Sequence, residues 1–187
     1  DRSLEFTLRA EGRSYQEIAE MGGGIRSSVE SVRARSVEEI VAYSRPFVER
    51  ALRLGTTTME VKSGYGLSTE AERMLLQAAI EIRASTKMEI VSTFLGAHAV
   101  PKGLTQEGYV TSIIQDQLPA LSGLAEFCDV FMDEGYFSAA ETIRISHAAN
   151  TYGLKIKLHA DELAETNGAT TAVLLDAFSA DHLLKVS

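Results

Sequence analysis

The sequence predicts an α/β fold in which parallel strands alternate with helices. Strand-like and helix-like stretches alternate from about residue 36, and the predicted strands begin near residues 56, 89, 126, 155 and 178. Strands separated by helical segments at this spacing are typical of βα units and a parallel sheet. Polar side chains such as Lys62, His98 and His159 follow the strands at their carboxyl ends. Length slightly favours a doubly wound sheet, whereas polar groups contributed by many strands favour an incomplete (β/α)8 barrel.

Length and composition fit one domain and exclude several classes of function. The chain has 187 residues, of which 45% are hydrophobic and 24% charged, and 26 acidic residues outnumber 18 basic ones. An acidic chain without a basic cluster is not expected to bind nucleic acid. No apolar run approaches the ~18 residues of a membrane span. Cys128 is the single cysteine and lies in an apolar strand, which predicts a buried thiol in a reducing compartment.

Capping boxes and prolines mark the predicted helices. Helix starts are indicated by Ser14–Glu17, Ser36–Glu39, Thr69–Glu72 and Ser138–Glu141, each with a hydroxyl residue three positions before a glutamate. Pro46 lies inside the second of these helices and should kink or split it. The segment from about 105 to 122 is predicted to be helical, with a disturbance near its end at Pro119.

The strand at 155–159 indicates a polar interior. Strand alternation places its two lysines and His159 on one face and the apolar residues between them on the other. Glu60 likewise shares a strand face with Thr58 and Lys62. Because lysines are almost never buried without a partner, we predict that Lys157 pairs with Glu60 inside the barrel.

The histidines are the strongest candidates for chemistry. His159 is followed three residues later by Glu162, and a neutral imidazole beside a carboxylate suits a metal ligand with a proton shuttle. The same spacing also describes a loop histidine paired with a carboxylate. His98 and His182 each close a strand and fit either ligands or packed residues, and His147 is predicted to lie on the packed side of its helix.

Signatures of other site types are missing from the sequence. It contains no His-x-His pair, no Gly-x-Gly-x-x-Gly or Walker-type loop after a strand, and no Gly-x-Ser-x-Gly motif. The run Met21–Gly24 follows a helical pattern, so a flexible turn is favoured over an anion-binding loop. These patterns alone indicate an enzyme-like α/β domain and leave its reaction open.

Six short stretches in combination resemble the imidazolonepropionase family of metal-dependent amidohydrolases. They are RSLEF (2–6), GGGI (22–25), KSGYGL (62–67), GAHAVP (96–101), HADE (159–162) and SADH (179–182). The resemblance extends over essentially the whole chain, and KSGYGL and GAHAVP are its most specific parts. It implies a partial (β/α)8 TIM-like barrel, about strands two to six, so that residues 1–187 form a fragment of an amidohydrolase barrel domain.

The resemblance also implies an activity and a set of site residues. The family hydrolyses the cyclic amide C–N bond of 4-imidazolone-5-propanoate to N-formimidoyl-L-glutamate, in histidine degradation, with one zinc or iron ion. His159 matches a metal ligand, Glu162 matches the carboxylate that carries a proton to the leaving nitrogen, and His182 matches the histidine that orients the attacking water. The positions that match substrate-binding residues are Arg2, Tyr15, Tyr65, His98 and Glu162.

Two alternatives stay open beside this interpretation. The first is another amidohydrolase, such as a deaminase of a heterocyclic base, which would not need Arg2 and Tyr65 for a carboxylate tail. The second is a non-catalytic α/β fragment. The family's remaining ligands, a His-x-His pair and an aspartate, have no counterpart here, so we expect a piece of a longer protein that is inactive alone. The resemblance further implies a cytoplasmic enzyme with a small-molecule substrate, without nucleic-acid or membrane partners, and with a homodimer as one candidate assembly.

Overall fold

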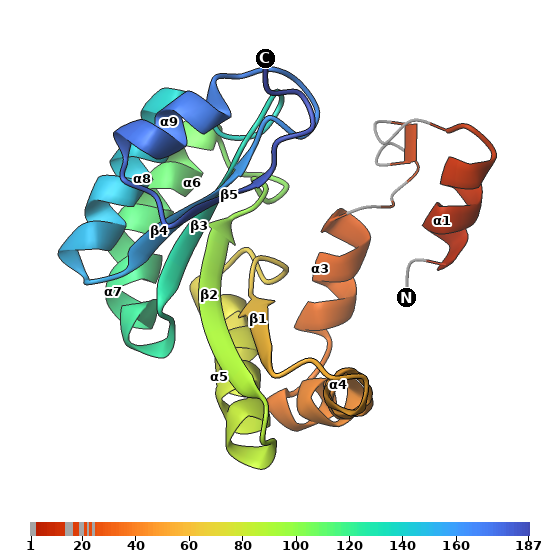
Figure 1. Cartoon of the computed structure of the whole chain (residues 1–187). Helices are drawn as coiled ribbons and strands as arrows, with labels where there is room; N and C mark the ends of the chain where they lie inside the picture. Colours follow the sequence, from red (N-terminus) through yellow and green to blue (C-terminus); the bar gives the residue numbers. More distant parts are fainter. Residues whose placement is uncertain (1–2, 14–16, 19–20, 22, 24) are drawn as a thin grey trace.

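All the strands found among the described residues lie in one parallel sheet, which curls into part of a barrel (Figure 1). The computed structural model describes residues 3–13, 17–18, 21, 23 and 25–187. The strands are β1 (Thr58–Lys62), β2 (Glu89–Ala97), β3 (Phe127–Met132), β4 (Lys155–Ala160) and β5 (Ser179–His182). Their order across the sheet follows their order in the chain. A doubly wound sheet would reverse its strand order, so this topology confirms the predicted partial (β/α)8 barrel.

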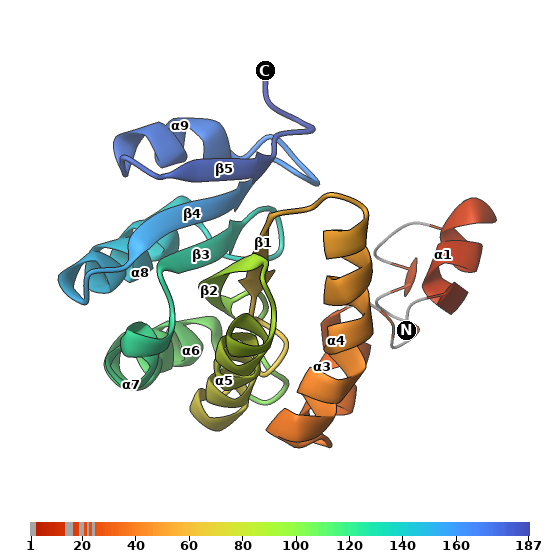
Figure 2. The ribbon, with the colours of Figure 1, turned by 60° about the horizontal axis from the view of Figure 1, so that its bottom comes forward.

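Helices cover the outer, convex side of the curled sheet (Figure 2). The described helices are α1 (Ser3–Ala10), α3 (Ile25–Arg33), α4 (Val37–Arg53), α5 (Thr69–Ser85), α6 (Gln106–Ser112), α7 (Leu118–Leu121), α8 (Ala139–Thr151) and α9 (Gly168–Leu174). A π-helical turn (Ile113–Gln117) joins α6 to α7, and a 3₁₀ turn (Ser122–Leu124) follows. None of the described helices is long and apolar enough to cross a membrane.

The capping boxes were predicted correctly for two helices and wrongly for one. Ser36 and Ser138 cap α4 and α8, each with the glutamate three residues later closing the box. The box at Thr69–Glu72 does not form, because Ser68 is the N-cap of α5 and Glu72 is engaged elsewhere. The box predicted at Ser14–Glu17 lies largely outside the described residues.

The prolines of α4 and α7 behave differently. Helix α4 runs unbroken through Pro46, so of the predicted kink or split, the split is wrong. An interior proline costs a helix ~3 kcal/mol. Here Val41 and Val48 of α4 are buried against α5 and the start of β2, and this packing holds the helix together. Pro119 is in the first turn of α7, which tolerates proline. The helical segment is interrupted just before it by the π-helical turn.

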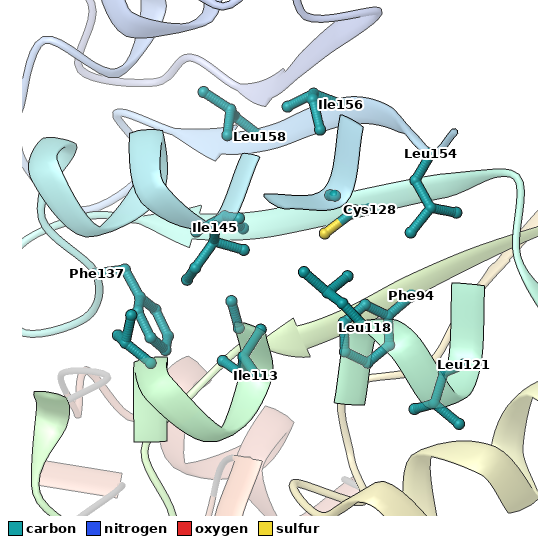
Figure 3. Close-up of a cluster of buried hydrophobic side chains, with 14 of the residues drawn as sticks. Phe94, Ile113, Leu118, Leu121, Cys128, Phe137, Ile145, Leu154, Ile156 and Leu158 are labelled. Carbon is teal, nitrogen blue, oxygen red and sulfur yellow. The ribbon is translucent and has the colours of Figure 1, made fainter. Parts of the chain in front are cut away.

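The main core lies between the outer face of the sheet and the helices. Figure 3 shows its central side chains, which come from the strands, α7, α8, the π-helical turn and the segments that flank α8. Ile156 and Leu158 of β4 are buried in this core, and their neighbours Lys157 and His159 face the opposite side. The predicted face assignment is therefore confirmed. Cys128 is also fully buried, as predicted, and burial raises the pKa of its thiol.

Candidate active site

A row of predicted site residues with aromatic or imidazole rings lies at the carboxyl edge of the sheet, and the ring of Phe131 on β3 contacts two of them, His98 and His159. Tyr65 follows β1 and meets His98, which follows β2, edge-on at 5.0 Å between ring centroids. The His98 ring lies 5.9 Å from the His159 ring at the end of β4. The His159 ring lies 5.0 Å from the ring of His182, the last residue of β5. The structure therefore brings together predicted site residues that are up to 117 positions apart in the sequence (182 − 65).

Glu162 joins this row of rings at its β5 end. Its Oε2 atom lies 3.5 Å from Nε2 of His182, and both side chains are about one-third exposed. Imidazoles and carboxylates within this reach can exchange protons with a bound molecule or water. The arrangement places the partly exposed imidazole of His159 beside a more accessible acid–base pair.

The loop between β1 and α5 is fixed from several sides. Nδ1 of the buried His98 lies 2.9 Å from the carbonyl oxygen of Gly64. Gly64 has a φ of +96°, and a Cβ there would lie 2.7 Å from the carbonyl oxygen of Leu95. Only glycine fits this position. Arg33 of α3 donates to the carbonyl oxygens of Gly66 and Leu67, at 2.7 and 3.2 Å.

Glu72 is a structural residue of this loop that the sequence interpretation missed. It is fully buried, and its carboxylate accepts hydrogen bonds from the backbone N–H groups of Gly64, Gly66 and Leu67, at 2.7 to 2.8 Å. These bonds fold the loop around the carboxylate and hold Tyr65 at the carboxyl edge. A capping box explained the glutamate locally, so the sequence gave no reason to seek a second role.

A charged network fills the inner face of the sheet below the rings. Nζ of Lys62 on β1 lies 2.7 Å from Oδ2 of Asp129 on β3 and 2.5 Å from Oδ2 of Asp181 on β5. Lys157 on β4 donates to Oε2 of Glu60 on β1 at 3.0 Å, which confirms the predicted pair. Contacts between alternate strands, here β1, β3 and β5, are the way (β/α)8 barrels build their interior layers.

The network stabilises its own charges. Burial alone would raise the pKa of Asp129, but the hydrogen bond with His159 and the charge of Lys62 outweigh burial, so the pKa lies below its usual range. Burial would lower the pKa of Lys62, yet Asp129 and Asp181 raise it above its usual value. The pKa of Asp181 is lowered because Lys62 outweighs the effect of burial. All three side chains are therefore ionised at neutral pH.

His159 has the hydrogen-bond arrangement of a metal-binding histidine. Its Nδ1 atom lies 3.1 Å from Oδ1 of Asp129, which is fully buried. Histidines that bind metals commonly donate their second ring N–H to a carboxylate, which leaves the other nitrogen free to coordinate. With Nδ1 engaged in this way, Nε2 of His159 is the ring nitrogen left to bind a metal. The site residues present therefore fit a metal ion.

Asp129, His159 and Asp181 also form a cluster that could hold a metal ion, because each offers a ligand atom within 4.8 Å of the others. In the present arrangement the ammonium group of Lys62 already lies between the two carboxylates. Asp129 was not among the predicted residues. Its signal was available, since it is the one charged residue in the apolar strand Phe127–Met132 and alternates with the buried Cys128 and Val130.

Two buried aspartates fix the loop that carries Glu162. Asp133 accepts the backbone N–H groups of Glu162 and Leu163, both at 2.8 Å, through one carboxylate oxygen. Asp161 accepts those of Thr166, Gly168 and Ala169. Asp161 and His182 have left-handed φ values of +50° and +74°. Such conformations in residues other than glycine concentrate at functional sites.

Two predicted site residues lie outside the described part of the chain, and one prediction about a histidine is wrong. Arg2 and Tyr15 lie outside the described residues, so their predicted substrate contacts stay predictions. His147 is exposed, and its predicted place on the packed side of α8 is wrong. The buried face of α8 is formed instead by Thr142, Ile145, Ser146 and Ala149, so His147 falls on the solvent side between successive turns.

The fold and the site together define the class of protein: part of a (β/α)8 barrel with histidines and a carboxylate at the carboxyl edge of its strands, where such barrels place their active sites. An adenine deaminase from Arthrobacter aurescens has a similar fold, with a TM-score of 0.55 at 16% identity, over 76% of this chain and 44% of that chain. No family model matches the sequence.

Curated relatives identify the particular protein that the chain resembles. Over its whole length it is 45% identical to an imidazolonepropionase from Alkaliphilus oremlandii and 47% identical to one from Syntrophobacter fumaroxidans. Over 98% of its length it is 44% identical to an imidazolonepropionase from Haloarcula marismortui. The resemblance to imidazolonepropionase is thereby confirmed. The chain spans 44–45% of the length of these relatives.

Proposed function

We propose that the chain is part of the (β/α)8 barrel domain of an imidazolonepropionase. The complete protein would hydrolyse the cyclic amide C–N bond of 4-imidazolone-5-propanoate to N-formimidoyl-L-glutamate, a step of histidine degradation. The observation that carries this proposal is the convergence of Tyr65, His98, His159, Glu162 and His182 at one edge of the sheet. Relatives at 44–47% identity that bear the name imidazolonepropionase support the choice of reaction.

His159 is the proposed metal ligand of this chain. A zinc or iron ion would supply an activated water at neutral pH. The free Nε2 of His159 is the atom that would bind it, and the hydrogen bond with Asp129 fixes the imidazole ring. The geometry supports a metal ion at this position, and the choice of zinc or iron follows from the family resemblance.

Glu162 and His182 are the proposed acid–base residues. In the hydrolysis, the hydroxyl group of water is added to the carbonyl carbon, the C–N bond breaks, and the second proton of the water goes to the leaving nitrogen. Glu162 would accept that proton and deliver it. His182 lies 3.5 Å from Glu162 and would orient the water. Both side chains are partly exposed and can reach a bound substrate.

Tyr65 and His98 are the proposed substrate-binding residues of the described chain. They lie on neighbouring loops with their rings in contact, on the far side of His159 from His182. Arg2 and Tyr15 are proposed to complete the binding site, since an arginine suits a carboxylate through two parallel hydrogen bonds. We further propose a cytoplasmic location and a homodimer, both from the family resemblance.

The proposal is tested with the complete protein that contains this chain. The purified protein, loaded with zinc or iron, is given 4-imidazolone-5-propanoate, and N-formimidoyl-L-glutamate is followed by mass spectrometry. The parallel reaction uses adenine and follows ammonia. Formation of formimidoylglutamate without ammonia from adenine supports the proposal. Ammonia release from adenine without turnover of the imidazolone would instead indicate a deaminase.

A further inference from the structure

The carboxylate of Asp129 joins the proposed metal ligand to the charged network of the barrel interior. Nδ1 of His159 makes its hydrogen bond with Oδ1 of Asp129 at 3.1 Å; Oδ2 is 3.0 Å away but is not its hydrogen-bond partner. Nζ of Lys62 lies 2.7 Å from Oδ2. Asp129 has no solvent exposure, and the side chains of His159 and Lys62 are 13% and 20% exposed. No water needs to mediate either contact, because both are within direct hydrogen-bond distance.

We propose that Asp129 is a positioning residue that sets the tautomer and the ring orientation of His159, and that Lys62 fixes the Asp129 carboxylate for this role. The inference rests on the proposed function, in which His159 binds the metal. It adds two residues that act through another residue and touch neither the substrate nor the metal. It also explains why a charged residue occupies a fully buried position in the apolar strand β3.

The physical reason lies in the two nitrogens of a neutral imidazole, of which one carries the proton and the other a lone pair. A carboxylate can only accept, so Asp129 requires the proton on Nδ1 of His159 and leaves the lone pair on Nε2. A metal needs that lone pair. Lys62 can only donate, so it holds Oδ2 of Asp129 and keeps the carboxylate from turning away.

Asp129→Asn tests this arrangement because the amide has one acceptor and one donor end. The ammonium group of Lys62 would attract the amide oxygen, so the amide NH₂ would face His159. The NH₂ group can only donate, and it would therefore force the lone pair onto Nδ1 and the proton onto Nε2. A histidine in that tautomer cannot offer Nε2 to a metal. The double variant Asp129→Asn/Lys62→Met releases the amide, which can then turn its oxygen to His159.

The experiment measures zinc affinity and tautomer in the complete protein. Metal-free protein is titrated with Zn²⁺ against a chromogenic chelator, and the ring nitrogens of His159 are followed by ¹⁵N NMR. Loss of a carboxylate that orients a ligating histidine typically weakens metal binding 10–100-fold, and we expect a loss of about that size in Asp129→Asn. We expect the lone pair of His159 to move to Nδ1 in this variant. The double variant should regain zinc affinity and the wild-type tautomer.

Asp181→Asn is the matched control. Asp181 shares Lys62 with Asp129, at 2.5 Å, but its hydrogen bonds in the described structure go to Lys62 and Ser179 and not to His159. The zinc affinity of the Asp181→Asn variant should equal that of the wild type. An equal loss of affinity in Asp181→Asn and Asp129→Asn would overturn the proposal, because both aspartates would then be ligands or mere sources of charge.

The remaining outcomes are equally decisive. Wild-type zinc affinity in Asp129→Asn, or an unchanged tautomer, would overturn the positioning role of Asp129. No recovery in the double variant would overturn the role of Lys62. Wild-type protein that binds neither zinc nor iron would refute the metal in the proposed function, while the NMR measurement on metal-free protein would still decide whether Asp129 sets the tautomer.

Discussion

The ammonium group of Lys157 donates a hydrogen bond to Oε2 of Glu60 at 3.0 Å, although β4 and β1, which carry these residues, are separated in the sheet by β2 and β3. The contact is direct because the sheet curls and brings the inner faces of these strands together (Figure 2). The side chains are only 12% and 26% exposed, so the pair is largely removed from water. It bridges the inner faces of β1 and β4 two residues before His159.

Breaking this pair should cost stability in proportion to its burial. Removing one partner of a fully buried ion pair costs ~3–5 kcal/mol. Glu60 keeps Thr93 and Lys62 as neighbours, so we expect Lys157→Met to lower the free energy of unfolding by about 1–3 kcal/mol. Urea unfolding followed by circular dichroism measures this change.

Two further variants separate the pair from its surroundings. Glu60→Gln/Lys157→Met removes both charges but leaves an amide oxygen to accept from the buried Thr93 hydroxyl, so it should be more stable than Lys157→Met alone, in which the Glu60 charge loses its main partner. Lys155→Met changes the exposed lysine of the same strand and should have little effect. Equal destabilisation by Lys155→Met and Lys157→Met would show that the ion pair has no special weight.

The sequence predicts this pair because both residues lie in regular strands. Alternation fixes the side of the sheet on which a strand residue lies, and a buried lysine requires a carboxylate. The alternation of strands and helices likewise predicts a parallel sheet with Tyr65, His98 and His159 at its carboxyl edge, whereas the choice of a partial barrel over a doubly wound sheet came from the family resemblance. Side-chain alternation also places Asp129, the one charged residue of the third strand, on the inner face of the sheet. The sequence therefore contained a signal for this residue as well.

Other features of the site depend on contacts that local patterns do not encode. Glu72 satisfied a capping-box pattern, but its carboxylate reaches back to the loop of residues 64–67. Asp133 holds a loop about 30 residues further along the chain. Which face of α8 is buried depends on how the helix is rotated about its own axis, and a short stripe of apolar residues does not determine that rotation. The exposure of His147 follows from it.

Glu72→Gln should loosen the loop that carries Tyr65. In the wild type, three backbone N–H groups donate to the two oxygens of the Glu72 carboxylate. Glutamine keeps one acceptor oxygen, but its NH₂ group would face an N–H donor. A buried donor without a partner costs ~1–3 kcal/mol, so we expect a stability loss of about that size. Amide hydrogen exchange at residues 64, 66 and 67 should accelerate. Glu70→Gln, at an exposed position of the same helix, is the control and should leave this exchange unchanged.

The Lys62–Asp181 pair should make stability depend on pH at both extremes. The pKa of Asp181 is lowered in the folded protein, so its stabilising contribution is complete above the unfolded pKa of ~3.9. That contribution is lost as the pH falls through the lower folded pKa. The pKa of Lys62 is raised, so its contribution is complete below the unfolded pKa of ~10.4 and is lost as the pH rises through the folded pKa.

Thermal unfolding measured as a function of pH tests this pair. The melting temperature of Asp181→Asn should fall less steeply below about pH 4 than that of the wild type, because one shifted carboxylate is gone. Asp116→Asn alters an exposed carboxylate and should follow the wild-type curve. If the melting temperature of Asp181→Asn fell as steeply below pH 4 as that of the wild type, the pair would contribute nothing to stability at acid pH.

Replacement of His159 and Glu162 should separate metal binding from proton transfer in the complete protein. His159→Ala removes the proposed ligand, so metal content and turnover of 4-imidazolone-5-propanoate should fall together. Glu162→Gln keeps the size and polarity of the side chain but cannot accept and pass on a proton. The metal and the KM should be retained, while kcat should fall by about the ~10²–10⁴-fold that general acid–base groups contribute. Glu165→Gln, at an exposed position of the same loop, should keep a normal kcat.

Metal analysis and steady-state kinetics on the three variants decide between a catalytic Glu162 and one that merely braces the loop. A brace would give a modest loss of stability with nearly normal turnover, and that result would remove Glu162 from the mechanism.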